Sequence, residues 1–364
     1  MKKKYLLTAK ILTICLILVS CAETKSEEED VIYLEHRSIP LDPSSFVDSY
    51  RLIPLEITDN SIFRKISKFE KYDSTYFILD DSKTQNIIYL YNLEGKYKTK
   101  IDRKGDGPHE YVRIMDFTLS KDMIALVVYP RKIMFIDLKT MNVKEEVPLS
   151  KSYNEIIIEN DDCYLYDSYS GILDVYNMEQ KEFKTIFEYK PLKGLIPFEK
   201  SLYFSDDNLY FNAVGEDILY AIKDNKLEPI FRFDYPDRND SHTFFSNREM
   251  DAIELTEIGR YSLPNISNIF KIQNNLAFIY SFQSSSLINI MNKSNERENY
   301  YISTALPMFP SIAFIKNNKL TSWQYLFELE RLPENSIIPK DEIKKIKQTN
   351  GDIETIVLIE YTFK

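Results

Sequence analysis

The sequence predicts an all-β protein in which repeated units of four antiparallel strands close into a ring, the six-bladed β-propeller. Three observations support this fold. Hairpins of one outline recur along the chain, their spacing is nearly constant, and both ends of the chain carry strands that lack a unit of their own. Repeats of a few tens of residues with several strands per repeat are typical of propellers.

Each recurring hairpin consists of an apolar strand, a polar turn and a second apolar strand. The turns contain Asp73, Asp122, Asp161, Asp207, Asn275 and Asn318. Asn and Asp tolerate positive φ, so they suit tight turns in a chain that has only eight glycines. Successive turns are 49, 39, 46, 68 and 43 residues apart, which indicates a period of about 45 residues.

A third and a fourth strand follow most hairpins, for example residues 87–91 and 97–101 after the first one. Four-stranded antiparallel blades, six times, are therefore expected, with a β-sandwich or two stacked β-domains as the alternative. Residues 49–55 precede the first hairpin, and residues 353–361 end the chain as a long strand. Because a propeller protects its strand edges by closing, we expect these N- and C-terminal strands to share a sheet.

The longest spacing predicts an insertion over residues 236–266, between blades 4 and 5. Within it, residues 244–259 have apolar side chains at helical spacing, which predicts one amphipathic helix. Residues 333–351 interrupt the last unit with a proline and a lysine-rich run, and there we expect a solvated loop.

The N-terminus has the layout of an export signal, because three lysines precede an apolar run that ends in Leu18-Val19-Ser20-Cys21. The run is too short to span a bilayer. Its last four residues resemble the lipobox of bacterial lipoproteins, which implies that Cys21 is diacylated and anchors the protein in a membrane. The expected domains are a signal peptide (1–20), a flexible acidic tether (21–45) and the propeller (46–364).

The acidic residues that follow Cys21 resemble the surface-export signals of Bacteroidetes lipoproteins. This resemblance implies a lipid-anchored protein of the bacterial outer membrane that faces the outside of the cell.

Composition argues against several functions. The net charge is −10, and removal of residues 1–20, with four lysines and no acid, makes it −14. Such a surface repels the phosphates of nucleic acid. Cys15 leaves with the signal and Cys21 carries lipid, so Cys163 has no partner for a disulfide or a cysteine-rich metal site.

No catalytic motif is present: the chain lacks a Gly-x-Ser-x-Gly elbow, a His-Glu-x-x-His motif and a phosphate-binding glycine loop. The three histidines, His36, His109 and His242, have no spacing typical of a metal site or a triad. We therefore predict no catalytic residue, metal ligand or cofactor. Because carboxylates are abundant, a glycosidase-like pair or a calcium site at the central channel stays open.

The segment Gly105-Asp-Gly-Pro-His-Glu-Tyr111, followed by Asp116-Phe117, resembles the signature of the six-bladed propeller lipoproteins of Bacteroidetes, relatives of the NHL-repeat propellers. The resemblance covers essentially the whole mature chain and implies its fold, but it implies little about activity. His109 stands where that signature has a glycine.

The same segment predicts a sharp turn between the first two blades, because its glycines and proline restrict the backbone. Two interpretations of its side chains stay open. In the structural one, Glu110 accepts bonds from backbone amides and Tyr111 wedges between blades. In the functional one, a binding loop consists of Arg103, Lys104, His109, Glu110 and Tyr111.

The chain has 26 tyrosines and one tryptophan. Tyrosines at alternating strand positions are expected to pack between blades. Those in predicted strands are Tyr89, Tyr91, Tyr164, Tyr166, Tyr169, Tyr176, Tyr203 and Tyr210.

The sequence thus predicts a binding or scaffold module at the cell envelope, with a glycan, polymer or protein as its partner and no chemistry of its own. The alternative is a hydrolase or lyase whose carboxylates, or a calcium ion that they hold, lie at the mouth of the channel.

Overall fold

The structure is a computed structural model. It describes residues 30–33, 39–40, 47–62, 64, 66–190, 200–205, 208–213, 215–234, 265–272, 275–282, 285–291, 297–301, 312–316, 319–334, 336–350 and 354–364.

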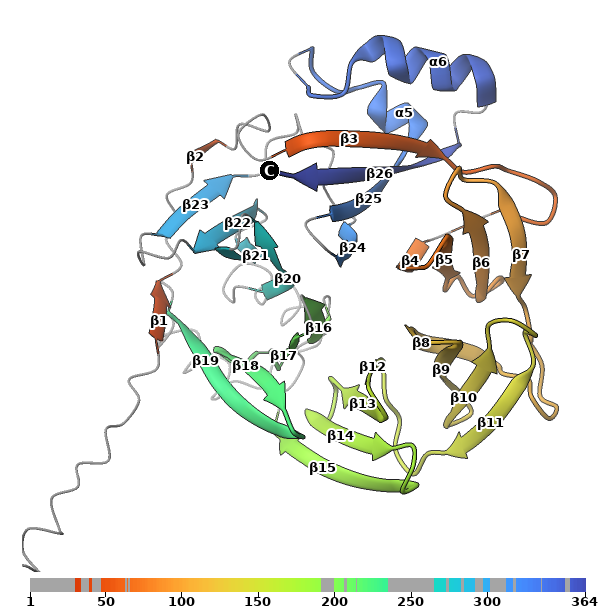
Figure 1. Cartoon of the computed structure of the whole chain (residues 1–364), viewed down its shortest axis with the longest axis vertical. Coiled ribbons are helices and arrows are strands. Elements are labelled where there is room, and N and C mark those ends of the chain that lie inside the picture. The colour runs from red at the N-terminus through yellow and green to blue at the C-terminus, as the bar shows by residue number, and fades with distance from the viewer. Residues whose placement is uncertain are drawn as a thin grey trace, which may run out of the picture.

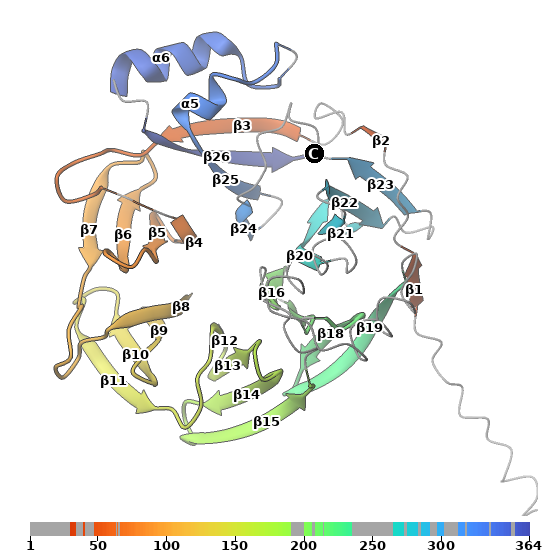
Figure 2. The same ribbon diagram turned by 180° about the vertical axis from the view of Figure 1, so that it is seen from behind.

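The strands form sheets that stand around a central axis as a ring, seen from its two sides in Figure 1 and Figure 2. Five blades each consist of four consecutive antiparallel strands, which we number from the axis outward: blade 1 is β4–β7, blade 2 is β8–β11, blade 3 is β12–β15, blade 4 is β16–β19 and blade 5 is β20–β23. A composite sheet with the strand order β24-β25-β26-β3 completes the ring.

The strands of the first three blades have the following bounds: β4 Ile66–Tyr72, β5 Thr75–Asp80, β6 Ile87–Asn92, β7 Tyr97–Ile101, β8 Arg113–Ser120, β9 Met123–Tyr129, β10 Lys132–Asp137, β11 Val143–Pro148, β12 Glu155–Glu159, β13 Asp162–Asp167, β14 Ile172–Asn177 and β15 Glu182–Glu188. Those of the last two blades are β16 Leu202–Ser205, β17 Asn208–Phe211, β18 Ile218–Lys223, β19 Lys226–Asp234, β20 Asn265–Ile272, β21 Asn275–Phe282, β22 Ser285–Met291 and β23 Arg297–Tyr301. The composite sheet contains β24 Ile312–Lys316, β25 Lys319–Tyr325, β26 Ile356–Phe363 and β3 Val47–Pro54.

The all-β propeller with four-stranded antiparallel blades is confirmed, but the prediction of six blades is wrong, because the ring has five blades and is closed by the composite sheet. Only five blades are continuous in sequence, because the composite sheet takes three strands from the C-terminal part and one from the N-terminal part. In this sheet β26 pairs antiparallel with β3, from Val357 opposite Pro54 to Phe363 opposite Val47. The expected closure of the ring by the two terminal strands is therefore confirmed, and it covers edges that would otherwise be open.

Two sheets also depart from the expected four strands. β1 (Asp30–Tyr33) pairs parallel with β19, and β2 (Ile39–Pro40) pairs parallel with β23. Each adds a fifth strand to the outer edge of a blade. The sequence pattern did not indicate these strands because they are short and belong to the segment that we expected to be a flexible tether.

The hydrophobic core lies between neighbouring sheets. Between blades 1 and 2, for example, Phe77 and Leu90 pack with Phe117 and Leu126. Seven of the eight strand tyrosines are buried, as the alternation predicts, whereas Tyr169 lies in the turn after β13 and is exposed. The expected use of Asp and Asn in turns is also found, since Asp73 and Asn160 adopt φ of 51° and 54°.

Two helices stand between β25 and β26: α5 (Leu326–Leu329) and α6 (Lys340–Asn350). Helix α6 lies within residues 333–351, where we expected a solvated loop. Acidic residues occupy the first turn of α6 and a lysine its last turn, which suits the helix dipole. Ile343 is buried, and Ile346 packs against the composite sheet at helical spacing. The lysine-rich run is therefore the polar face of a helix.

The expected helical insertion of residues 236–266 lies outside the described residues, except for the first two residues of β20. Among the helices that the structure describes, none combines the length and the apolar composition that a bilayer crossing needs.

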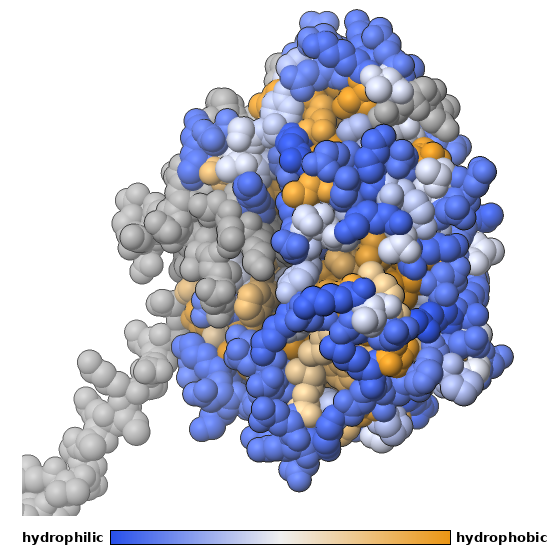
Figure 3. All heavy atoms as spheres, turned by 45° about the vertical axis from the view of Figure 1, so that its right-hand side comes forward, coloured by the Kyte–Doolittle hydropathy of each residue, from blue (hydrophilic) through white to orange (hydrophobic). Residues whose placement is uncertain are grey.

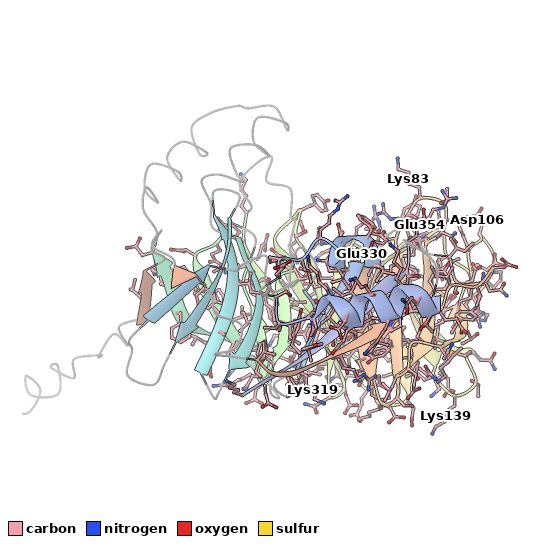
Figure 4. The ribbon with its side chains drawn as sticks, turned by 90° about the horizontal axis from the view of Figure 1, so that it is seen from above. Lys83, Asp106, Lys139, Lys319, Glu330 and Glu354 are labelled. Atoms are coloured by element: carbon pink, nitrogen blue, oxygen red, sulfur yellow. The ribbon has the colours of Figure 1, made fainter. Side chains whose placement is uncertain are left out.

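The ring has two unlike faces. One face carries two kinds of loop: those that join one blade to the next, and those that join the second strand of a blade to its third strand. We call it the long-loop face. Lys83 and Asp106 lie there in Figure 4, whereas Lys139 and Lys319 lie on the opposite, short-turn face. These faces follow from the antiparallel order, because successive connections fall at opposite ends of the strands.

Candidate functional site

The predicted binding loop connects β7 to β8 on the long-loop face and closes on itself. The Tyr111 N–H donates to the Arg103 carbonyl at 2.9 Å, and the Gly105 N–H donates to the Tyr111 carbonyl at 2.9 Å. The Tyr111 ring is fully buried, and its hydroxyl donates to the Ile101 carbonyl at 3.2 Å. Burial raises the pKa of this phenol above its ordinary value. Tyr111 is thus a wedge in the core between blades 1 and 2.

Glu110 lies inside the turn. Its Oε2 accepts a bond from the Gly107 N–H at 2.8 Å. A Cβ on Gly105 would lie 2.0 Å from the same oxygen, so glycine there makes room for the carboxylate. His109 has a φ of 62°, the left-handed conformation that favours glycine, which explains why the similar signature has glycine at this position.

The two cations of the loop differ in their contacts. Arg103 donates from Nη2 to the Met141 carbonyl at 2.7 Å, whereas Lys104 lies 3.3 Å from the Lys83 carbonyl and is exposed. The His109 side chain is also exposed, with Nδ1 3.7 Å from Glu146 Oε1. Of the predicted binding residues, Lys104 and His109 therefore face solvent, and Arg103, Glu110 and Tyr111 make internal contacts. The binding role of this loop stays a prediction.

The other sequence candidates are separate from this loop. Cys21, His36 and His242 lie outside the described residues. Cys163 is buried in β13, and burial raises the pKa of its thiol, which keeps the sulfur protonated and unreactive.

Apolar side chains are exposed on the long-loop face of three consecutive blades. They are Ile62 before β4, Val112 before β8, Tyr129 at the end of β9 and Tyr169 after β13, and we call them the loop-face apolar set. The two tyrosines are 57% and 67% exposed. The Val112 N–H donates to the Tyr129 carbonyl at 2.8 Å, so these two residues are neighbours. Exposed apolar side chains that lie next to one another, as Val112 and Tyr129 do, are more typical of interaction sites than single ones.

A cluster of charged residues occupies the innermost strands of blades 1 to 3 and the residues just before the innermost strand of blade 4, and the sequence analysis did not identify it. We call it the inner-strand cluster: Lys68 and Glu70 in blade 1, Asp116 in blade 2, Glu155 in blade 3 and Lys200 at the start of blade 4. The Lys68 ammonium is 2.8 Å from Asp116 Oδ1 and 3.0 Å from Glu70 Oε1, and it also donates to the Phe117 carbonyl. Lys200 approaches Asp116 at 3.8 Å.

Each carboxylate of the cluster also binds the backbone of the next blade. Glu70 Oε2 accepts from the Leu119 N–H at 3.1 Å, and Asp116 Oδ2 accepts from the Ile156 N–H at 3.0 Å. Glu155 Oε2 accepts from the N–H groups that open blade 4, at 2.8 and 3.0 Å. The cluster therefore joins blades 1 to 4 through charge-assisted hydrogen bonds.

The pKa values of the cluster follow from the burial of its side chains between the blades. Loss of water raises the pKa of Glu155 to about 7, because two backbone bonds only partly offset the desolvation of its carboxylate. Desolvation together with the nearby charge of Lys68 lowers the pKa of Lys200 to about 8. For Lys68 desolvation acts in the same direction, but the carboxylates of Asp116 and Glu70 raise its pKa overall.

Glu155 has one oxygen without a partner. Its Oε1 and the neighbouring Ser201 Oγ are buried, and neither has a hydrogen-bond partner among the described residues. A neutral carboxylic acid tolerates this environment better than a carboxylate, in agreement with the raised pKa. Lys200 is the most exposed member of the cluster, with 43% of its side chain exposed, so the desolvation of its ammonium group is partial.

This arrangement suits blade-to-blade attachment more than chemistry on a substrate, since its carboxylates are shielded. In the part of the chain that the structure describes, no three His, Cys, Asp or Glu side chains are placed to hold a metal ion. The sequence signal for the cluster was weak: an acid or a lysine within an otherwise apolar innermost strand, as in Arg113-Ile-Met-Asp-Phe117.

Comparisons with known proteins agree with the fold. One solved structure is that of a Bacteroides fragilis protein whose description as exported is provisional. Its sequence is 15% identical to this chain, and the two structures match with a TM-score of 0.70 over 92% of this chain and 99% of that one. A streptogramin B lyase is 13% identical, with a TM-score of 0.47 over 86% of this chain and 98% of the lyase. The N-terminal domain of Nup159 is 10% identical, with a TM-score of 0.45 over 82% of this chain and 81% of that domain. At these identities only the first likeness bears on this chain, and it shows the fold alone.

No curated protein matches the chain. The profile of one family, a domain of unknown function designated DUF4934, matches residues 29–359 and so covers nearly the whole propeller. The chain is a member of the DUF4934 family.

Proposed function

We propose that this protein is exported, is anchored in the outer membrane by lipid on Cys21, and acts on the cell surface as a non-catalytic binding or scaffold module. Its partner is a glycan, a polymer or another protein, and the long-loop face binds it. The observation that carries the proposal is the exposure of the loop-face apolar set, with Tyr129 and Tyr169 more than half exposed.

Physical reasons favour these tyrosines as binding residues. A tyrosine offers a large rigid surface for stacking on a sugar ring or filling a protein pocket, and its hydroxyl adds a hydrogen bond. Tyr129 ends β9 and Tyr169 lies in the turn after β13, so a rigid scaffold holds both at its loop ends, where binding residues concentrate. Lys104 and His109 add exposed polar groups on the same face, in the loop that ends at Val112.

The export signal, the lipobox-like residues 18–21 and the resemblance to NHL-like lipoprotein propellers support the anchor. The provisional description of the Bacteroides fragilis protein as exported agrees with this location.

A photo-crosslinking amino acid in place of Tyr129 or Tyr169, in the full chain on living cells, tests the binding face. Phe183 in β15 is the matched control, because it is an exposed aromatic residue on an outermost strand. We expect adducts at positions 129 and 169 and none at 183. Mass spectrometry of the adduct distinguishes a glycan from a protein. Equal adducts at all three positions, or none at 129 and 169, would contradict the proposal.

A hydrolase or lyase is the second candidate, and one observation favours it. Glu155 lies beside Lys200, since its carboxylate accepts from the Ser201 and Leu202 N–H groups, and burial raises the pKa of Glu155 to about 7, as in catalytic acids. The burial of Glu155 argues against it, since a catalytic group must reach its substrate. Cleavage of a glycan by the wild type that Lys200→Met abolishes, with folding intact, would favour this candidate over simple binding.

A further inference from the structure

The N-terminal segment follows the outside of the ring over three neighbouring sheets. β1 lies on the outer edge of blade 4, with Asp30 opposite Phe231 and Tyr33 opposite Asp234. β2 lies on the outer edge of blade 5, with Ile39 opposite Tyr300. β3 is the outermost strand of the composite sheet. Three strands of the N-terminal segment are therefore fixed to the perimeter, and the first of them begins at Asp30.

The attachment point lies on one side of the ring. In Figure 1 β1 is at the left, and the outermost strands of blades 1 and 2, β7 and β11, are at the right. Figure 2 shows the same opposition from behind. We call the outer edge of blades 4 and 5 the strap edge, and that of blades 1 and 2 the far edge.

The link from Cys21 to Asp30 is short. Nine residues span at most roughly 30 Å whatever path they take, whereas a domain of this length is about 50 Å across. With lipid on Cys21, the far edge cannot rest on the membrane while the strap edge points away from it.

The chemistry of the other surfaces argues against their resting on lipid. The far-edge side of the molecule is covered mainly by hydrophilic side chains, with hydrophobic residues visible in the gaps between them (Figure 3). The described turns of the short-turn face carry both signs of charge, with Asp122 paired to Lys139 and Asp161 to Lys121. This face therefore has no excess of positive charge that would attract anionic head groups. The long-loop face must stay open if it binds a partner.

We propose that the strap edge faces the lipid surface, so that the ring stands on its perimeter with its axis roughly parallel to the membrane. This inference rests on the proposed lipid anchor. It identifies the membrane as the neighbour of blades 4 and 5 and leaves both faces, including Tyr129 and Tyr169, open to large partners.

Single-cysteine variants of the lipidated full chain test this orientation. Cys163 is buried, so a maleimide fluorophore labels only the introduced thiol. Glu228→Cys in β19 reports on the strap edge, Thr99→Cys in β7 on the far edge, and Asp106→Cys and Asp122→Cys on the two faces. All four positions are exposed. The protein is bound to vesicles of phosphatidylethanolamine and phosphatidylglycerol that carry a head-group quencher.

We expect quenching to be severalfold stronger at position 228 than at position 99, with both face labels in between and similar to each other. Equal quenching at 228 and 99, with one face label strongest, would show a ring lying flat and would overturn the orientation while leaving the anchor intact. Cys21→Ser should abolish vesicle binding. If it does not, the lipid anchor is wrong and the orientation argument fails with it.

Discussion

The loop over residues 103–111 and the inner-strand cluster both join neighbouring blades, but they do so by different physics. The loop uses backbone conformation: glycines leave space for Glu110, and Tyr111 fills the core. The cluster uses buried charge, with carboxylates that bind an ammonium group and the backbone of the next blade. Only the loop was visible in the sequence, as a glycine-rich motif.

The difference affects how each region responds to substitution. A turn can relax into solvent when one contact is lost, so its contribution is limited to a few hydrogen bonds and one φ angle. A buried ion cluster cannot relax in this way, because removing one charge leaves its partner without compensation in a dry environment. We therefore expect the cluster to dominate the stability of the ring.

The largest effect is expected for Asp116→Ala. It leaves Lys68 with Glu70 as its remaining close carboxylate and leaves the Ile156 N–H without its acceptor. Breaking a buried pair from one side costs about 3–5 kcal/mol of unfolding free energy. Urea denaturation of the full chain, followed by circular dichroism, measures the change.

Asp122→Ala is the matched control for this prediction. Its pair with Lys139 is exposed on both sides, at 3.4 Å, and we expect a change within about 0.5 kcal/mol. Similar losses in the two variants would mean that the cluster is no more important than a surface pair.

A smaller effect is expected from pH, through Glu155. Its folded pKa of about 7 lies above the ordinary value of 4.5, so folding favours the neutral acid. The contribution to stability is complete below about pH 4.5, decreases as the pH rises toward 7 and is lost above it. One pKa unit corresponds to about 1.4 kcal/mol, so the free energy of unfolding should fall by about 3 kcal/mol over this pH range.

Glu155→Gln removes this proton equilibrium but keeps the side-chain shape and an acceptor for the Ser201 N–H. Between pH 5 and pH 8 we expect the free energy of unfolding of the Glu155→Gln variant to fall less than that of the wild type. Urea denaturation at each pH measures both. Parallel curves for the two proteins would show that Glu155 ionises freely in the fold.

Sequence reasoning identified the propeller because strand alternation and Asn or Asp turns are local signals, as at Asp73 and Asn160. It also identified the closing pair of residues 49–55 and 353–361, since unpaired strands at both ends require a partner. It missed β1 and β2 because two to four residues on an existing edge carry no periodic pattern. It missed helix α6 because lysines hid the spacing of Ile343 and Ile346.

The inner-strand cluster was missed for a different reason. Lys68, Asp116 and Glu155 are more than 35 residues apart in sequence, and each alone is indistinguishable from a solvated charge. Only the ring geometry brings them together. Conversely, the loop residues were recognised, and the structural interpretation of Glu110 and Tyr111 agrees with the internal contacts that they make.

The smallest effect is expected for His109→Gly, which restores the glycine of the similar signature. Because a left-handed backbone costs a side-chain-bearing residue about 1 kcal/mol, the variant should be more stable than the wild type by up to that amount. Lys104→Gly is the control within the same loop, since Lys104 is also exposed but is not among the residues with positive φ; it should lose stability.

If His109→Gly gains stability and keeps the crosslinks at positions 129 and 169, the loop serves the fold alone. If stability rises while those crosslinks disappear, the imidazole is retained for binding against a conformational cost, and the loop belongs to the binding face.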